Sequence, residues 1–260
     1  MYNPVQVAEE TATLDWISNG RFILGVGQGY RKSEFDAFCA RKDRRGDLME
    51  EYVQLIKRLW TEDNVTFEGE FYSCKNVSLR PKPKQKPRPE IWVGAKSQPA
   101  IARVSRIGDV WFADGISPIE VLARRLGDLG AGNRRTVRVA VARETFVSSS
   151  TDEAWASVET HLKEKYRTYY EWGQLQDENG STIDPRTIEF DEVWGQVKSR
   201  FVVGSPERCI DMIARISEKL DATFFMANFR HTRMPEHLIN ESMRLFGGQV
   251  IPHFATDRHH

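Results

Sequence analysis

The segment RFILGVGQGY at residues 21–30 places three glycines at alternate positions after an apolar run. The run is short and does not alternate, which is typical of a strand covered on both faces in a parallel sheet. Glycines at such a strand end let backbone N–H groups approach a bound group, because no Cβ intervenes. We therefore expect an anionic group near the strand exit, at Gly27, Gln28, Gly29 and Tyr30.

The spacing of these glycines is neither the GxGxxG of dinucleotide-binding folds nor a P-loop. A tight turn without a ligand is therefore an equally good interpretation of this stretch taken alone.

A second apolar strand at residues 91–93 ends in a similar way. Four residues at its exit are able to approach a ligand: Gly94, Ala95, Lys96 and Ser97. Ser97 suits the N-cap of a helix that begins at Gln98, and a helix N-terminus carries partial positive charge and free N–H groups. An ordinary capped turn is the alternative, but two such strand ends favour one anion held between them.

The elements that must position these exits alternate along the chain. Strands are expected at residues 21–26, 91–93, 109–113, 137–143 and 223–229. Helices are expected at residues 5–17, 45–60, 98–107, 117–129, 154–172, 205–220 and 235–246, with a short helical turn at 32–38. Strand and helix alternating five times predict a parallel α/β architecture with right-handed crossovers.

Three segments lie outside this alternation. Residues 65–72 predict a small β-hairpin that turns at Glu68-Gly69, and residues 173–190 are polar and turn-rich, which indicates a loop or lid. Residues 80–89 interleave basic residues with proline and are expected to be extended. An SH3-type ligand or a polyanion contact are the functional alternatives there, but a stiff surface connector is favoured because core residues follow directly.

Composition limits the function classes. The chain has 260 residues, 40% of them hydrophobic, and its 37 basic residues balance 37 acidic ones. This balance argues against nucleic acid and anionic membranes as partners, and no stretch approaches the roughly 20 apolar residues of a spanning helix. Without a signal-peptide pattern, a cytoplasmic protein is expected. The three cysteines, Cys39, Cys74 and Cys209, are expected to be buried thiols, and no metal site is expected.

Taken together, the motifs LDWISNGRFILGVGQGY, VTFEGEFY, LRPKPKQKPRPEIWVGAKS and IGDVWFAD resemble the luciferase-like flavin-dependent monooxygenases. The resemblance runs in order from Pro4 to Pro252. It implies a TIM barrel with the active site at the carboxyl ends of the strands, built here as one domain over residues 1–260. The five expected strands would be the fourth to eighth, so the resemblance predicts an incomplete barrel: a fragment, a late-start reading frame, or a chain that another chain completes.

The resemblance also implies roles for residues. Gln28 stands where bacterial luciferase has an arginine near the flavin phosphate, and residues 94–97 match the second phosphate-holding loop. Asn228, Arg230 and His231 would face the mouth of the pocket, with Arg230 able to orient a polar substrate. His231 is expected to be a solvated surface side chain. Catalytic residues cannot be assigned, because in the family they often lie on the three missing strands.

The implied function is a monooxygenase that uses reduced FMN and O2 on a small organic substrate, with the flavin reduced by a separate reductase and the chain forming a homo-oligomer. A close relative within the family uses a deazaflavin coenzyme for hydride transfer without oxygen, and that alternative stays open. A non-catalytic flavin-binding remnant or subunit is the alternative from another class. The identity of the substrate does not follow from the sequence.

Overall fold

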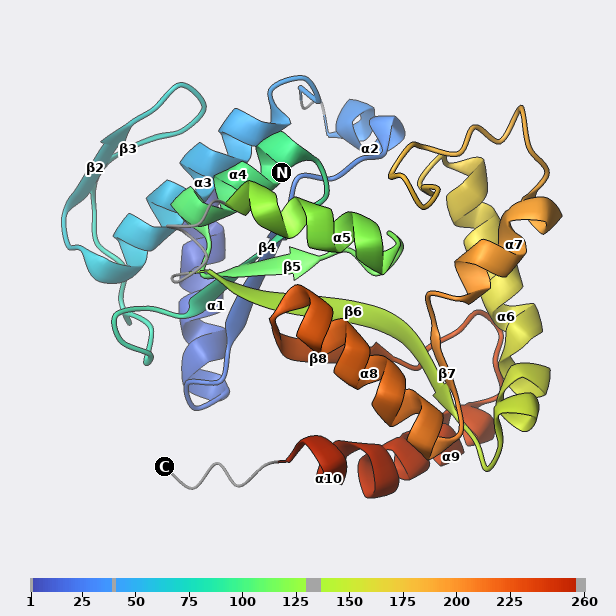
Figure 1. The fold of residues 1–260 in the computed structure, drawn as a ribbon. Coiled ribbons are helices and arrows are strands. Elements are labelled where there is room, and N and C mark those ends of the chain that lie inside the picture. The colour runs from blue at the N-terminus through green and yellow to red at the C-terminus, as the bar shows by residue number, and fades with distance from the viewer. Residues whose placement is uncertain (1, 39–40, 130–136, 256–260) are drawn as a thin grey trace. The chain divides into compact units, whose positions relative to one another are not determined.

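The computed structural model describes residues 2–38, 41–129 and 137–255 of the chain (Figure 1). They form two compact units, which are described separately here. The first unit comprises Met1–Phe112 with Asp128–Arg138, and the second comprises Ala113–Gly127 with Val139–His260. Cys39 lies outside the described residues.

The first unit contains the helices and strands expected from the first half of the sequence. They are α1 (Pro4–Ile17), β1 (Ile23–Gly27), α2 (Lys32–Ala37), α3 (Arg45–Thr61), β2 (Val65–Glu68), β3 (Ser73–Val77), β4 (Glu90–Ala95), α4 (Gln98–Ile107) and most of β5 (Val110–Ala113). Helix α1 begins as its sequence predicts, because the side chain of Asn3 accepts a hydrogen bond of 2.9 Å from the amide of Val5 and proline occupies the first turn.

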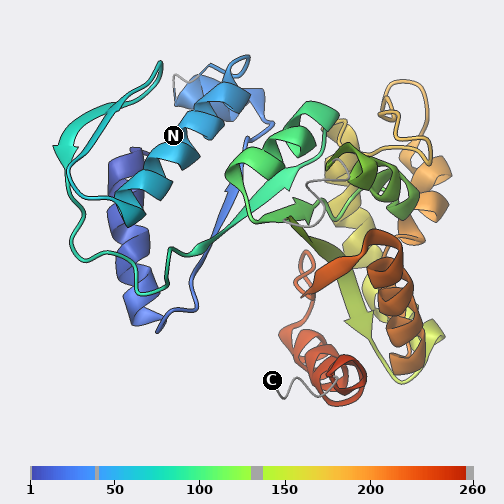
Figure 2. The ribbon, with the colours of Figure 1, turned by 60° about the vertical axis from the view of Figure 1, so that its left-hand side comes forward.

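Strands β1 and β4 pair in parallel and lie side by side in Figure 2. Their register sets Gly27 opposite Gly94, so the two strands end at the same level. The expectation that β1 is covered on both faces is wrong for the described structure: Leu24 is buried, but Ile23 is 41% exposed. The continuous apolar run reflects residue type, whereas exposure depends on what packs against each face.

The connector at residues 80–89 packs on the helices of its own unit. The carboxylate of Asp15, fully buried on α1, accepts hydrogen bonds from the backbone amide and the side-chain amide of Gln85 at 2.8 and 2.7 Å. The ammonium group of Lys82 in the connector donates to the carbonyl of Leu59 on α3 at 2.8 Å. These contacts support the interpretation of the segment as a connector.

The hairpin is present, but its turn differs from the expectation. Strand β2 pairs antiparallel with β3, which starts only at Ser73. The reason is Glu51 on α3, whose carboxylate accepts the backbone N–H groups of residues 70, 71 and 72 at 2.6–2.9 Å. Those amides are therefore not available to extend the β ladder, and the turn is longer than Glu68-Gly69 alone.

The second unit contains the remaining elements. They are α5 (Ile119–Leu126), nearly all of β6 (Arg138–Val147), α6 (Thr151–Glu171), α7 (Phe190–Lys198), β7 (Val202–Gly204), α8 (Pro206–Leu220), β8 (Ala222–Asn228), α9 (Glu236–Leu245), a π-helical turn at Phe246–Val250 and α10 (Ile251–Phe254), while a 3-10 turn at Gly127–Leu129 follows α5. Strand β6 pairs in parallel with both β7 and β8.

Three elements of this unit were not expected from the sequence: α7, β7 and the short helix α10. Helix α7 does have a signal, since Phe190, Val193, Trp194 and Val197 are buried at the spacing of one helical face. Strand β7 has only three residues, too few for a pattern. Aromatic rings hold this part together: Phe201 packs edge-on against Tyr166, with ring centroids 4.6 Å apart.

Strand β1 pairs in parallel with β4, and β6 pairs in parallel with β7 and β8, whereas β2 and β3 form an antiparallel hairpin; this confirms the α/β class. Their pairings do not close into a ring within residues 2–38, 41–129 and 137–255. Among the described helices, none is both long enough and apolar enough to cross a membrane. Cys209 is buried, which raises the pKa of its thiol to about 12, and Cys74 is half-buried.

Candidate functional site

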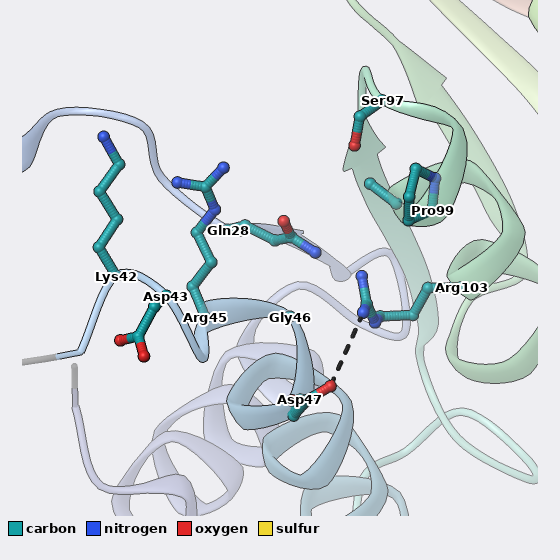
Figure 3. A pocket seen from close by; sticks show the side chains of 10 residues that line it. Gln28, Lys42, Asp43, Arg45, Gly46, Asp47, Ser97, Pro99 and Arg103 are labelled. Carbon is teal, nitrogen blue, oxygen red and sulfur yellow. Dashed lines mark ion pairs between the residues drawn. The ribbon is translucent and has the colours of Figure 1, made fainter.

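The two predicted strand exits meet at a cavity of about 580 Å³ in the first unit. We call it the Gln28 cavity. It is lined by Gln28, Lys42, Asp43, Arg45, Gly46, Asp47, Ser97, Pro99, Ala100 and Arg103. Figure 3 shows the Gln28 amide between the guanidinium groups of Arg45 and Arg103, with the Ser97 hydroxyl on the loop after β4.

The secondary structure explains this convergence. Because Gly27 and Gly94 are partners in the β1–β4 pair, the loops that follow leave the sheet next to each other. Helices α3 and α4 also begin here, since Arg45 and Gly46 open one and Ser97 precedes the other. The N-termini of two helices, which have 17 and 10 residues, therefore border one cavity, and each N-terminus carries partial positive charge.

Ser97 occupies the N-cap position of α4, as the sequence predicts, but its side chain makes no capping hydrogen bond. Arg44, the N-cap residue of α3, makes none either. Neither helix start is thus closed by its own N-cap side chain. The Ser97 hydroxyl is left available to a ligand together with first-turn N–H groups.

The cations of the cavity differ in how far they are already paired. Arg103, whose side chain is 13% exposed, contacts Glu50 at 3.3 Å and lies 4.0 Å from Asp47. The hydrogen bond from Arg106 and the charge of Arg103 hold the pKa of Glu50 below its usual range, although partial burial opposes this. Arg45, by contrast, makes no ion pair or side-chain hydrogen bond with another described residue. Its charge is available to a ligand.

Gln28 supplies a further donor. Its Nε2 is buried and has no hydrogen-bond partner among the described residues. A buried donor left unpaired costs free energy, so a ligand acceptor at this point would remove that penalty. Gln28 and Arg45 also border an apolar cavity of about 600 Å³ in the same unit.

The other predicted residues of the two exits do not line the Gln28 cavity. Gly29 adopts a positive φ of 69°, so it shapes the turn after β1. A Cβ at Gly27 would meet nothing within 4 Å, so packing does not require glycine there. Tyr30 is 42% exposed. Gly94, Ala95 and Lys96 form the end of β4 and the start of its loop without reaching the cavity.

Three cations of the cavity were missed by sequence reasoning: Lys42, Arg45 and Arg103. A signal existed for Arg45, because it opens the long helix α3 between β1 and the next core strand, and helices after parallel strands start at the ligand-binding edge. Arg103 lies within a helix, where an arginine is ordinarily a solvated residue. Only folding places it beside Gln28.

The predicted pocket-mouth residues lie in the second unit. Arg230 is exposed, and its backbone amide donates a hydrogen bond of 3.2 Å to the side-chain oxygen of Asn228. His231 corrects the expectation: its side chain is fully buried, not solvated. Its Nε2 lies 3.2 Å from the carbonyl oxygen of Thr145 and its Nδ1 lies 3.3 Å from Oε2 of Glu144. A residue that follows a strand is ordinarily a surface position, but the side chain of His231 turns back onto β6.

Glu144 on β6 is thereby part of a buried charged cluster. Lys165 donates to its Oε1 at 2.7 Å, and the hydroxyl of Tyr166 lies 3.4 Å from the same oxygen. Burial opposes ionisation of Glu144, but the contacts with His231 and Lys165 outweigh it and lower the pKa of the carboxyl. Asn228, Arg230 and His231 line neither of the cavities described in the first unit.

Comparison with known proteins identifies the family of the chain. The luciferase-like monooxygenase family matches residues 1–223, which is most of the sequence. The chain belongs to that family. The expected resemblance is confirmed.

The similar proteins use two kinds of flavin-type cofactor. An FMNH2-dependent dimethylsulfone monooxygenase of Pseudomonas fluorescens is 32% identical over 96% of this chain and 70% of its own length. An F420-dependent glucose-6-phosphate dehydrogenase of Kineococcus radiotolerans is 39% identical over 96% of this chain and 74% of its own. The match to the dimethylsulfone monooxygenase of Pseudomonas putida spans 44% of that protein.

Among solved structures, monooxygenase RslO1 of Streptomyces bottropensis superposes with a TM-score of 0.82 at 22% identity, over 98% of this chain and 75% of that one. This supports the predicted fold class, a parallel α/β structure of the TIM-barrel type in which the described strands do not close. The family members support an oxidoreductase that works with a flavin-type cofactor.

Proposed function

We propose that this chain is a flavin-dependent monooxygenase that holds the phosphate of reduced FMN in the Gln28 cavity. The observation that carries the proposal is the meeting of two helix N-termini with the Arg45 guanidinium, the Arg103 guanidinium and the unpaired Gln28 amide around one cavity. Three lining cations face two lining carboxylates, Asp43 and Asp47, so the positive charge of the cavity is in excess. An anion is the ligand that this arrangement favours.

The residues present fit a phosphate monoester. Arg45 would form a charge-assisted pair with a phosphate oxygen, and Gln28 would donate from Nε2. The Ser97 hydroxyl and the first-turn amides of α4 would complete the shell. The bound flavin would supply the redox chemistry with O2, whereas the chain binds, orients and excludes water. Asn228 and Arg230 remain the predicted contacts of the substrate. The loop at residues 173–190 remains the predicted lid.

The second candidate function is hydride transfer with a deazaflavin coenzyme. The relative that is 39% identical over 96% of this chain is an F420-dependent enzyme, which is the observation that favours it. FMN ends in a phosphate monoester, so its binding should depend more steeply on Arg45 than that of a coenzyme attached through a phosphodiester. A separate reductase and a homo-oligomeric assembly belong to this proposal as predictions.

The test compares FMN with riboflavin, which lacks the phosphate, by fluorescence titration of the full chain. We expect Arg45→Gln to weaken FMN binding about tenfold to a hundredfold and to leave riboflavin binding unchanged, because a charge-assisted hydrogen bond contributes about 1.5–3 kcal/mol. The control is Lys75→Gln, which removes an exposed cation on β3 that lines no cavity described here.

Equal affinities for FMN and riboflavin, or equal effects of the two variants, would contradict the proposal. Protein that stays colourless with FMN and shows no turnover with a reductase would favour the non-catalytic alternative. Tighter binding of deazaflavin than of FMN would favour hydride transfer.

A further inference from the structure

A second cavity, of about 260 Å³, lies in the second unit. We call it the Arg200 cavity. It is lined by Pro118, Ile119, Glu120, Arg143, Glu178, Ser199, Arg200, Met212, Arg215 and Ile216. Three arginines thus come together from separate elements: Arg143 from β6, Arg200 from the segment between α7 and β7, and Arg215 from α8.

Arg143 is a buried cation without a carboxylate partner among the described residues. Its residue is 2% exposed, and its guanidinium donates to backbone carbonyls only, those of Asp114, Ala142 and Ser117 at 3.1–3.2 Å. The nearby carboxylate of Asp114 lies 3.7 Å from Arg125 instead. Burial lowers the pKa of Arg143, which is the sign of a charge whose desolvation is not compensated.

Arg200 is nearly as buried and is incompletely bonded. Its side chain is 3% exposed, and its terminal nitrogens donate to the carbonyls of Ile116 and Gln176 at 3.0 and 2.8 Å. Its Nε, however, is buried and has no hydrogen-bond partner among the described residues. A carboxylate oxygen of Glu178, whose side chain is half-exposed, lies 3.4 Å from a terminal nitrogen of Arg200 and not at its Nε. A buried N–H donor beside a cavity is therefore left for a ligand.

Arg215 on α8 adds an exposed guanidinium at the same cavity and makes no ion pair with a described residue. Glu120, the second lining carboxylate, is paired with Lys219. The lining side chains therefore hold more positive charge than their acidic neighbours neutralise. Arginines in this number suit the oxygens of a phosphate, which accepts several N–H groups at once.

From these contacts we infer that the Arg200 cavity binds a phosphate group, as inorganic phosphate or as the phosphate of a small ester. The cavity has about the volume that nine water molecules occupy in liquid water, so the ligand must be a small molecule. Arg200 would donate from Nε, Arg215 would close the open side, and Arg143 would supply positive charge from beneath. This site is separate from the Gln28 cavity, whose residues all belong to the first unit.

The experiment uses a background in which the Gln28 cavity has lost two cations, Lys42→Gln with Arg45→Gln. We expect calorimetric titration of this double variant with inorganic phosphate to show one site per chain. Adding Arg215→Ala should weaken that binding tenfold or more. The matched control adds Arg244→Ala, which removes an exposed arginine on α9 that lines neither the Gln28 cavity nor the Arg200 cavity, and should leave the affinity unchanged.

A second titration with glycerol 3-phosphate separates the two sources of the group. Binding as tight as that of inorganic phosphate identifies a phosphate ester, and binding of inorganic phosphate alone identifies the free ion. No binding to the double variant, or equal losses with Arg215→Ala and Arg244→Ala, would overturn the inference. Because Arg215 is exposed, the variant should fold, and an unchanged Tm without phosphate checks this. The outcome is independent of the FMN test, which probes Arg45 alone.

Discussion

The two cavities hold similar residues in opposite states. In the Gln28 cavity Lys42 and Arg45 are half-buried and Arg45 has no partner among the described residues, whereas in the Arg200 cavity Arg143 and Arg200 are buried and bonded to backbone carbonyls. An arginine in contact with solvent contributes to the binding of a ligand and little to the stability of the fold. The buried arginines donate most of their N–H groups to backbone carbonyls, and these hydrogen bonds stabilise the surrounding loops.

The largest contrast is expected in stability. Arg143→Ala should lower the free energy of unfolding by about 2–4 kcal/mol, because the carbonyls of Asp114 and Ser117 lose their donor and the lost side chain leaves a void. Arg45→Ala should change it by less than about 0.5 kcal/mol. Urea denaturation of both variants is the measurement. Equal losses would show that burial does not separate the two cavities.

A smaller contrast concerns acid stability. The pKa of Glu144 is lowered in the folded state, so its ionisation stabilises the protein above its ordinary pKa of 4.5, and this contribution is lost as pH falls through the folded value. Glu144→Gln should therefore cost about 1–3 kcal/mol at pH 7, and less as the pH is lowered from 5 to 3.

Glu50 in the first unit gives the matched comparison. Its pKa is lowered in the same direction, chiefly by Arg106, but its side chain is 22% exposed against 8% for Glu144. Glu50→Gln should show the same pH trend with a smaller amplitude. Unfolding curves at pH 7, 5, 4 and 3 test both, and a gap for Glu144→Gln that widens on acidification would contradict the assigned shift.

The smallest effect separates two serines at helix starts. Ser205 accepts a hydrogen bond from the amide of Arg208, so Ser205→Ala should cost about 1 kcal/mol. Ser97 makes no such bond, so Ser97→Ala should leave stability unchanged and weaken FMN binding about twofold to tenfold. Thermal unfolding and flavin titration measure the two. A stability loss at Ser97 equal to that at Ser205 would assign it an ordinary capping role.

Local signals predicted most of the elements of both units. The helix that starts at Pro4, the helix that starts at Pro206 and the strands at residues 91–93 and 109–113 follow from caps, prolines and apolar runs, which act within a few residues. Three elements were missed: α7 directly follows a polar, turn-rich segment, and β7 and α10 have only three and four residues. The predictions for Ile23 and His231 were wrong for another reason. The exposure of the one and the burial of the other depend on packing between segments that are distant in the chain.

The sequence by itself determined the alternation of strands and helices, the family, and the two strand exits at Gln28 and Ser97, because glycines, caps and ordered motifs are local features. Only the tertiary structure decided which charges meet there. Arg103 joins Gln28, and Arg143 joins Arg200 and Arg215, through contacts between residues far apart in sequence. No local pattern encodes such contacts, since side chains from separate elements are brought together only when their helices and strands pack.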